Sequence, residues 1–556
     1  SKAADGAPVP EAAATVAARR LACAAGRQLT DLLPEQRRAL DAVLCEARAG
    51  DEVLLHGVTG SGKTEVYLQA AAAMLDAGRT VLILVPEIGL TGQTVDRVRE
   101  RFGAEGVAVM HSGLAAGERL ATYVAIARGE RRIVVGARSA VFAPLPGLGL
   151  IVVDEEHDTS YKQENVPAYD ARRAARWRAE AAGAVVLLAS ATPSLEAYAR
   201  VALHVDLPRR VDGSSPPPLE VVDMRDRHDV FSPELAAALT ATLEAGEKAI
   251  LFQNRRGYAS SLACDHCGFV WECPRCDVSL TLFAGGKGLR CRTCGHSEPA
   301  PAVCPSCGSA DVVRYGFGTE RVEREVKALA PGVPLLRLDS DVAASHARLR
   351  AVLDGFGRPG PAVLVGTQMI AKGHHFPEVT LVGVVSADLT LHFPDFRAEE
   401  RTFAMLVQVG GRSGRGPGGG RVIVQTLDPE ARPIALAASG EWERFYAEEL
   451  ERRRTLGYPP ATHLVGLEVS SASADKAEKG GVYIASKVAE LLGDGAQVLG
   501  PGPLWRERDR SACRTLVKTA SLPSTLELLR PWVARYATRF SARGARLVAD
   551  VDPEWL

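Results

Sequence analysis

Short apolar segments alternate with helical stretches between about Asp31 and Asp223. The apolar segments, rich in β-branched residues, are Val53–Leu55, Val81–Val85, Val107–Met110, Ile133–Gly136, Leu150–Val153 and Val185–Ala189. Thr64–Ala77 and Asp170–Ala182 are two of the helical stretches that separate them. Continuous apolar strands separated by helices are typical of a parallel sheet that is covered on both faces. The pattern therefore predicts an α/β unit.

The alternation resumes at Ser232 and is interrupted once, by a cysteine-rich block. The elements predicted here are helices at 232–245, 320–330 and 344–355 and strands at 249–253, 335–338, 362–366, 380–385 and 421–425. After about Glu430, strands are predicted at 498–500, 514–519 and 545–551 and helices at 474–492 and 525–540. The predicted fold class is α/β, with two parallel-sheet lobes, a cysteine-rich insertion in the second lobe and a small C-terminal α+β domain.

Domain boundaries follow from these patterns. The predicted segments are a leader or linker remnant at 1–30, the first lobe at 31–225, the second lobe at 226–262 and 313–435, the insertion at 263–312 and the C-terminal domain at 436–556. The sequence shows neither a run of about eighteen apolar residues nor an apolar signal segment, so we expect a cytoplasmic, nucleoid-associated protein without a membrane partner. The net charge of −1 does not argue against nucleic-acid binding, because charged patches matter more than the sum.

Residues 57–64 match the phosphate-loop pattern G-x-x-x-x-G-K-[ST]. They follow a predicted strand and begin a predicted helix, a setting that argues against a glycine-rich surface turn. We expect Lys63 to contact the β- and γ-phosphates of ATP and Thr64 to bind Mg²⁺. The other residues of the predicted nucleotide site are Gln36, Gly57, Thr59, Gly60, Ser61 and Gly62. Glycine lets the backbone N–H groups turn toward one anion, and the helix N-terminus adds its dipole.

A run of acids follows the apolar strand Leu150–Val153. Asp154 is expected in the Mg²⁺ shell and Glu155 as the general base that polarises the attacking water. Ser190-Ala191-Thr192 gives another polar loop at the end of a strand. A solvated acidic strand end is the alternative, but it does not explain the phosphate loop about 90 residues upstream.

The segment Gln408–Arg415 carries two arginines in a glycine-rich setting. We assign catalytic roles to Gln408, Arg412 and Arg415, because the rigid guanidinium fork suits a γ-phosphate that develops charge. Taken alone, the segment could be a surface loop. Together with the phosphate loop and the acids it predicts a composite ATP site in which the lobes close on ATP and part after hydrolysis, as in a motor.

Eight cysteines form four C-x-x-C pairs: Cys264 and Cys267, Cys273 and Cys276, Cys291 and Cys294, Cys304 and Cys307. Eight thiolates can complete two closed tetrahedral zinc sites. The pairs can combine in three ways, and the five residues between the first two pairs make a nested arrangement easier. Disulfides and iron–sulfur clusters are the alternatives. In a large chain without a secretion signal, structural zinc is the preferred interpretation.

The motif order GVTGSGKT, DEEH, SAT, GTQMIAKGHHFP and QVGGRSGR resembles that of superfamily 2 helicases. Longer stretches, among them LVPEIGLTGQ, DEEHDTSYKQ, ASATPSLE, PDFRAEER and the late DVDP, resemble the bacterial PriA family of replication-restart helicases. The resemblance implies two RecA-like lobes, nested zinc pairing, and 3′→5′ ATP-dependent unwinding of forked DNA that leads to reloading of the replicative helicase. Members usually begin with a DNA-binding domain and a winged helix, so the chain is interpreted as a truncated helicase core.

DNA contacts are predicted at several positions. Candidate phosphate contacts are Arg138 and Ser139 in the first lobe and Thr367 and Lys372 in the second. Tyr161, Lys162 and Tyr169 follow the acids directly, in a loop that resembles the element through which single-stranded DNA triggers hydrolysis in the family. Stacking of a base on tyrosine would provide a physical basis for such coupling. Ordinary packing of the tyrosines is the alternative.

The predicted function is that of an ATP-dependent 3′→5′ DNA helicase core that remodels stalled or collapsed forks and promotes primosome assembly. Its expected cofactors are ATP, Mg²⁺ and two structural Zn²⁺ ions. Its expected partners are forked and single-stranded DNA, single-stranded DNA-binding protein and primosome or helicase-loader proteins, and the chain is expected to be a monomer. The alternatives are a DNA-stimulated translocase that does not separate strands and a restart scaffold with a degenerate ATP site.

Overall fold

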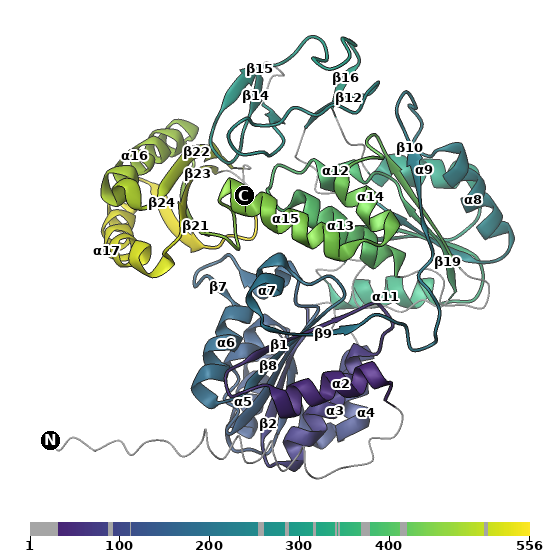
Figure 1. Cartoon of the computed structure of the whole chain (residues 1–556), viewed down its shortest axis with the longest axis vertical. Coiled ribbons are helices and arrows are strands. Elements are labelled where there is room, and N and C mark those ends of the chain that lie inside the picture. The colour runs from purple at the N-terminus through teal and green to yellow at the C-terminus, as the bar shows by residue number, and fades with distance from the viewer. Residues whose placement is uncertain are drawn as a thin grey trace. The chain divides into compact units, whose positions relative to one another are not determined.

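A computed structural model describes residues 32–86, 93–111, 113–253, 261–283, 288–314, 319–339, 342, 345–367, 378–411, 420–504 and 510–556 (Figure 1). The predicted leader at 1–30 lies outside these residues. The chain divides into two compact units, the first reaching Pro216 and the second beginning at Pro217.

The first unit is built on seven parallel strands in the order β3-β4-β2-β5-β8-β1-β9. The strands are β1 (Glu52–Gly57), β2 (Thr80–Leu84), β3 (Val107–Met110), β4 (Ile133–Gly136), β5 (Leu148–Asp154), β8 (Val185–Ser190) and β9 (Leu203–Leu207). The helices are α2 (Pro34–Asp41), α3 (Lys63–Asp76), α4 (Gln93–Phe102), α5 (Ala116–Ala127), α6 (Ala171–Ala182) and α7 (Leu195–Arg200). A short hairpin of β6 (Lys162–Gln163) and β7 (Tyr169–Asp170) precedes α6.

Alternate side chains of this sheet enter two separate cores. One core joins the strands to α2, α3 and α4, and the other joins them to α5, α6 and α7. Both faces are therefore covered, which explains why the strands are apolar throughout rather than alternating. In the strand order, β8 lies between β1 and β5, so the loops that follow these three strands share one edge of the sheet.

The second unit contains a six-stranded parallel sheet in the order β10-β20-β19-β11-β18-β17. Its strands are β10 (Leu219–Asp223), β11 (Lys248–Phe252), β17 (Leu335–Leu338), β18 (Ala362–Gly366), β19 (Val379–Val384) and β20 (Arg421–Thr426). Its helices are α8 (Pro233–Glu244), α9 (Thr319–Leu329), α11 (His346–Phe356), α12 (Asp388–Leu391), α13 (Ala398–Gly410), α14 (Arg432–Ser439) and α15 (Trp442–Leu456). The predicted boundary at 225 assigned β10 to the first lobe, whereas its pairing with β20 makes it the edge strand of the second sheet.

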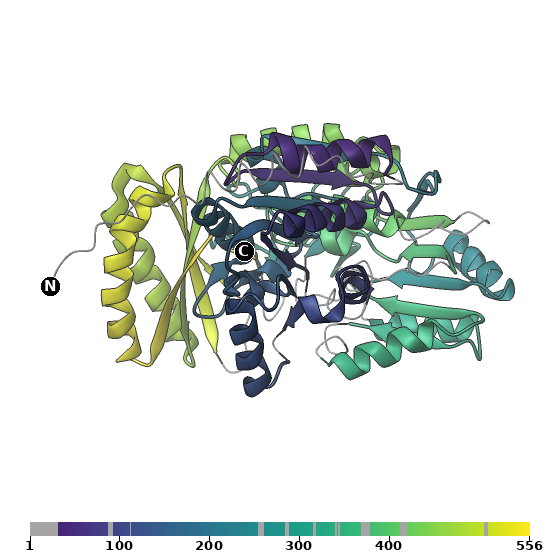
Figure 2. The same ribbon diagram turned by 90° about the horizontal axis from the view of Figure 1, so that it is seen from below.

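The cysteine-rich insertion consists of very short strands. They are β12 (Leu262–Cys264), β13 (Thr281–Leu282), β14 (Gly288–Arg290), β15 (Ser297–Pro299) and β16 (Val312–Arg314), which form one two-stranded and one three-stranded antiparallel sheet. The C-terminal domain has an antiparallel sheet in the order β22-β23-β21-β24. Its elements are β21 (His463–Ser471), α16 (Ala474–Leu492), β22 (Gln497–Pro503), β23 (Ser511–Thr519), α17 (Leu522–Ser541) and β24 (Ala545–Val551), and Figure 2 shows both helices on one side of the sheet.

The predicted fold class is confirmed: two parallel sheets, a cysteine-rich insertion in the second unit and a C-terminal α+β domain. The helix at 474–492 is observed with its predicted bounds. Strands β9 and β21 were not predicted, because His204, Asp206, Gly466 and Glu468 interrupt their apolar runs.

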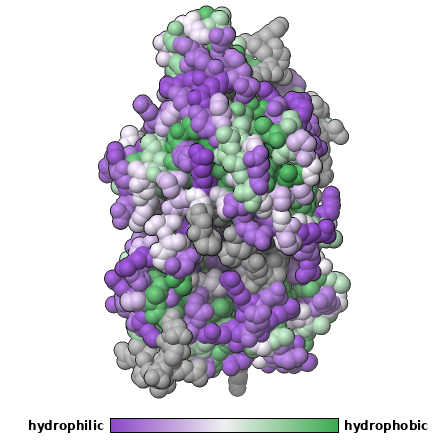
Figure 3. All heavy atoms as spheres, turned by 90° about the vertical axis from the view of Figure 1, so that its right-hand side faces the viewer, coloured by the Kyte–Doolittle hydropathy of each residue, from purple (hydrophilic) through white to green (hydrophobic). Residues whose placement is uncertain are grey.

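Polar side chains cover most of the surface drawn in Figure 3, and apolar residues appear there in small groups. Among the described residues, no helix has both the length and the apolar character needed to cross a bilayer.

Candidate nucleotide and zinc sites

The phosphate loop leaves β1 and enters α3 through glycines in the left-handed region. Gly60 has φ +88° and Gly62 has φ +82°, a conformation that costs other residues backbone strain. A Cβ atom on Gly62 would lie 2.2 Å from Nε2 of Gln36. Gly62 is also the N-cap of α3, and no side chain caps this helix. The backbone N–H groups of the first turn are therefore not shielded by a capping side chain, as a phosphate ligand requires.

Lys63 lies folded into this loop. Its Nζ donates hydrogen bonds to the carbonyl oxygens of Gly57, at 2.6 Å, and Val58, at 3.4 Å. Gln36 supports the loop from outside: its Nε2 donates to the carbonyl oxygen of Ser61 at 2.9 Å, and its Oε1 accepts from the Leu33 N–H at 3.0 Å. Gln36 was predicted as a nucleotide contact, and the structure places its amide on the loop backbone.

Asp154 ends β5 in a partly buried position close to Lys63. The pKa of Asp154 is raised to about 7, first by burial and then by the neighbouring Glu155 carboxylate, while the Lys63 ammonium acts in the opposite direction. The Tyr67 hydroxyl donates to Oδ2 of Asp154 at 3.3 Å. Burial disfavours the charged form of this carboxylate, and a cation beside it would stabilise that form. The phosphate-loop lysine and the acid that was predicted to hold Mg²⁺ are thus brought together.

Glu155 has a φ of +47°, which is unusual for a residue with a side chain. This conformation turns the chain sharply at the end of β5, so Glu155 and Glu156 leave the strand in different directions. Glu155 is half-buried at the sheet edge, while Glu156 is 2% exposed. Strained backbone of this kind persists only when its surroundings hold it in place.

The Ser190–Thr192 loop is hydrogen-bonded directly to the acidic segment after β5. Nδ1 of His157 lies 2.7 Å from Oγ of Ser190, and Ser190 Oγ accepts from the Thr192 N–H at 3.0 Å. The Glu156 N–H donates to the carbonyl oxygen of Ala189 at 3.0 Å. A conformational change in either segment would therefore alter the hydrogen bonds of the other.

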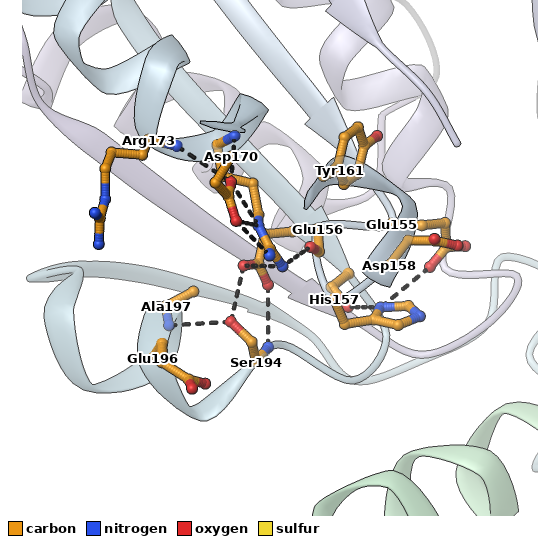
Figure 4. A network of polar contacts seen from close by, with 12 residues as sticks. Glu155, Glu156, His157, Asp158, Tyr161, Asp170, Arg173, Ser194, Glu196 and Ala197 are labelled. Carbon is orange, nitrogen blue, oxygen red and sulfur yellow. Dashed lines mark hydrogen bonds and ion pairs between the residues drawn. The ribbon is translucent and has the colours of Figure 1, made fainter. Parts of the chain in front are cut away.

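A buried polar network, drawn in Figure 4, was not predicted. Oε1 of Glu156 accepts from the Ser194 hydroxyl at 2.8 Å, and its Oε2 accepts from the Ser194 N–H at 3.0 Å. Arg172 donates to the Glu156 carbonyl oxygen at 3.2 Å and forms an ion pair of 2.7 Å with Asp170. Asp170 caps α6, and although burial raises its pKa, Arg172 outweighs this and keeps the pKa low. An acid just before a helix is a recognisable N-cap signal, but its link to Glu156 depends on tertiary contacts.

The predicted DNA contacts of the first unit differ in exposure. Tyr161 is 0% exposed, its ring lies in the core beneath α5 and α6, and its hydroxyl donates to the carbonyl oxygens of Leu84 and Asp154 at 3.0 and 2.6 Å. The prediction that Tyr161 stacks on a base is therefore corrected: packing, the stated alternative, applies. Lys162 is also buried, whereas Ser139 is exposed.

Two further contacts of this region change its interpretation. Arg138 donates to the carbonyl oxygens of Ser160 and Lys162 at 3.0 and 2.7 Å, so it braces the segment that leads into the hairpin. Tyr169 is half-buried, and its ring meets the edge of Phe142 at 5.0 Å. Phe142 is 54% exposed and was not predicted, although it follows the predicted DNA contacts Arg138 and Ser139 closely along the chain.

The second unit contributes fewer described positions. Thr367 follows β18 and donates its N–H to the carbonyl oxygen of Leu338 at 3.3 Å. Gln408 lies half-buried on α13. Lys372, Arg412 and Arg415 lie outside the described residues, so their predicted roles stay predictions.

The eight cysteines gather into two groups with nested pairing. Cys264, Cys267, Cys304 and Cys307 form the first site, and Cys273, Cys276, Cys291 and Cys294 form the second site, with the Sγ atoms of each group within 4.8 Å of one another. The Sγ pairs Cys264–Cys307, Cys267–Cys304 and Cys273–Cys294 are 3.6, 3.7 and 3.6 Å apart.

These spacings fit zinc and not disulfides. Four thiolates at about 2.3 Å from one Zn²⁺ would lie about 3.8 Å apart, whereas a disulfide requires about 2.05 Å. Each site joins a C-x-x-C turn from the first half of the insertion to one from the second half. The nested prediction is therefore confirmed, and the donor set of each site is that of a closed structural centre.

Comparison with known proteins gives three family matches. Residues 33–201 match "DEAD/DEAH box helicase", residues 273–299 match "PriA DNA helicase Cys-rich region (CRR) domain", and residues 454–554 match "Primosomal protein N C-terminal domain". A structure titled as RecG bound to a three-way DNA junction is similar with a TM-score of 0.45 and 17% identity, covering 79% of this chain and 52% of that chain. A likeness this low supports no functional inference.

Curated relatives are more similar. Replication restart protein PriA of Bacillus subtilis is 43% identical over 94% of this chain, and that of Synechocystis is 42% identical over 95%. The chain spans 66% and 65% of these relatives, less than two thirds of each. The Treponema pallidum protein of the same name is 40% identical, covering 96% of this chain and 81% of its own length. The chain belongs to the Replication restart protein PriA family, with a helicase domain, a cysteine-rich region and a C-terminal domain.

Proposed function

We propose that the chain is an ATP-dependent DNA helicase core with 3′→5′ polarity that remodels stalled or collapsed replication forks and promotes primosome assembly. The observation that carries the proposal is the convergence of Lys63, Asp154 and Ser190 at the ends of β1, β5 and β8. This is the arrangement that ATP hydrolysis needs: a phosphate cradle, a carboxylate for the metal and a loop that can report the state of the site. The family membership supports DNA as the partner.

In this proposal each residue has one role. The N–H groups around Gly60–Thr64 bind the phosphates of ATP. The Lys63 ammonium leaves the loop carbonyl oxygens to which it now donates and binds the β- and γ-phosphates instead. Glu155 accepts the proton of the attacking water. Gln408, Arg412 and Arg415 are proposed to act on the γ-phosphate, where a guanidinium stabilises the charge that develops.

Two kinds of metal are proposed. Thr64 and Asp154 would hold Mg²⁺, which when bound neutralises charge on the phosphates. The partly buried Asp154 carboxylate, with its raised pKa, fits such a cation. The two cysteine groups would each hold one Zn²⁺ in a structural role, as their Sγ spacings indicate.

The proposed partners are forked and single-stranded DNA, single-stranded DNA-binding protein and primosome or helicase-loader proteins, with the chain acting as a monomer at the nucleoid in the cytoplasm. Ser139, Tyr169, Thr367 and Lys372 remain proposed DNA contacts. Arg138, which braces the hairpin, would act on DNA through the position of the hairpin. The exposed Phe142 beside Tyr169 is a further aromatic surface for a base.

The direct test is the ATPase rate with and without single-stranded DNA, together with unwinding of a forked duplex. We expect DNA to stimulate hydrolysis and a fork with a free 3′ single strand to be unwound. Glu155→Gln should bind ATP and hydrolyse it about 10²-fold or more slowly, because only the general base is lost. Hydrolysis without strand separation would favour the translocase alternative. Undiminished hydrolysis in Glu155→Gln would reject the assignment of this residue.

A further inference from the structure

Three glycines in the insertion occupy equivalent places. Gly268, Gly295 and Gly308 each follow the second cysteine of a C-x-x-C turn, and their φ angles are +77°, +76° and +75°. The turn therefore requires a left-handed residue in all three cases. Their surroundings differ, however, and this difference shows what each cysteine turn packs against.

The first site packs against the parallel-sheet lobe. A Cβ atom on Gly268 would lie 2.5 Å from the carbonyl oxygen of Leu427, directly after β20. Leu427 shares a small apolar core with Met224 and Ala263. The Asp226 N–H donates to the carbonyl oxygen of Asp265 at 3.1 Å. All these contacts join the Cys264–Cys267 turn to residues that follow β10 and β20.

The second site packs against the C-terminal domain. A Cβ atom on Gly295 would lie 2.5 Å from the carbonyl oxygen of Pro501, and one on Gly502 would lie 1.8 Å from the carbonyl oxygen of Arg292. Arg292 also donates to the carbonyl oxygen of Pro503 at 3.3 Å. The Cys291–Cys294 turn and β22 thus meet backbone to backbone at two glycines, and Figure 1 shows the insertion above β22 and β23.

The cysteines of the second site are part of the core that they join. Cys273, Cys276 and Cys291 share one apolar cluster with Leu464 of β21 and Leu516 of β23. The Tyr458 hydroxyl donates to the carbonyl oxygen of Cys276 at 3.0 Å. The Tyr458 ring stacks on Phe396, just before α13, with centroids 4.4 Å apart. This core therefore connects the insertion, the lobe and the C-terminal domain.

We propose that the two cysteine sites dock on different partners within the chain: the first holds the insertion on the second parallel-sheet lobe, and the second is the docking surface for the C-terminal domain. The metal of the second site then keeps the C-terminal domain in place, because it fixes the Cys291–Cys294 turn that receives Gly502. The proposal rests on the proposed zinc binding, while the docking contacts themselves are independent of it.

Gly308 provides a matched control. It has the same backbone conformation as Gly295, but a Cβ atom there meets nothing within 4 Å. Gly308→Ala therefore adds the strain of a left-handed alanine without a clash, whereas Gly295→Ala adds the same strain and a clash with Pro501. Gly502→Ala approaches the same surface from the C-terminal domain.

The test is hydrogen exchange of residues 458–464 and 497–504 in the full chain, with zinc per chain measured for each variant. In Gly295→Ala and Gly502→Ala we expect two zinc ions and exchange that is about tenfold or more faster than in Gly308→Ala. Cys276→Ser should release the C-terminal domain, and Cys304→Ser should leave it docked. Equal exchange in Gly295→Ala and Gly308→Ala would overturn the docking assignment, and so would release of the C-terminal domain by Cys304→Ser but not by Cys276→Ser. If the wild-type protein still held two zinc ions per chain, the metal proposal would stand. Wild-type protein without zinc would refute both the metal and its role in docking.

Discussion

The nucleotide face and the cysteine-rich insertion place chemical groups in opposite ways. At the nucleotide face, Lys63, Asp154 and Ser190 sit at the ends of strands whose pairing and apolar cores hold the backbone in place. In the insertion, strands of two or three residues cannot fix eight cysteines, so we expect the thiolates, with the proposed metal, to hold the backbone instead. Removing one of these side chains from the nucleotide face should abolish ATP hydrolysis and preserve the fold. Removing a cysteine from the insertion should disrupt the local fold and leave the nucleotide face intact.

The largest expected effect is that of zinc removal. A structural zinc contributes roughly 10–16 kcal/mol to folding in small zinc domains, so chelation should unfold residues 261–314 while the first unit keeps its thermal transition. Calorimetry combined with a zinc indicator would measure this. The first site should release its metal first, because Cys307 is exposed. In the second site Cys294 is half-buried and the other three cysteines are buried. Simultaneous loss of both ions together with the first unit would contradict the contrast between the regions.

Lys63→Ala should lower DNA-stimulated ATP hydrolysis by about 10²–10³-fold, since the charge proposed to meet the γ-phosphate is lost. Nζ of Lys63 donates to the carbonyl oxygens of Gly57 and Val58 in its own loop, and we expect the first unit to keep its fold without these bonds. Steady-state turnover and circular dichroism on the same preparation provide both readouts. A variant that turns over ATP normally would remove Lys63 from the site.

Arg172→Ala tests the segment of the first unit in which ion pairs hold Asp170 and Glu156 in position. It leaves the buried Glu156 carboxylate and the half-buried Asp170 carboxylate without their shared cation, which should cost about 3 kcal/mol of unfolding free energy. Arg128→Ala is the control, because its pair with Glu130 is exposed and long at 3.9 Å, and its loss should cost less than about 1 kcal/mol. Denaturant unfolding of both variants would show the difference, and similar losses would mean that the network in Figure 4 does not stabilise the acidic turn.

The smallest expected effect on ATP hydrolysis is that of pH. Burial and Glu155 raise the pKa of Asp154 to about 7, whereas in the unfolded chain it is about 3.9. The native state binds this proton more tightly, so the free energy of unfolding falls as pH rises between about 4 and about 7. Asp154→Asn should flatten this slope in melting-temperature profiles. Wild-type ATPase should need several-fold more Mg²⁺ at about pH 6 than at about pH 8, because only the charged carboxylate binds the ion. An identical Mg²⁺ requirement at both pH values would argue against Asp154 as its ligand.

Sequence alone determined the features whose parts are close together along the chain. The phosphate loop, the acids after β5 and the C-x-x-C turns are each complete within about ten residues, and the apolar strands between helices identify the two parallel sheets. The five-residue spacer disfavoured joining the first two cysteine pairs, and the resemblance to the family favoured the nested arrangement that is observed.

Tertiary structure decided everything that depends on which distant segments meet. Tyr161 reads as an accessible aromatic residue, but its ring enters a core formed by α5 and α6. Glu156 meets Ser194 across 38 residues, β10 pairs with β20 in the second sheet, and Gly502 packs against Arg292 across most of the insertion and the lobe. Local patterns encode backbone conformation and chemical type, whereas burial and partner choice arise only when the packed chain excludes water from particular pairs of surfaces.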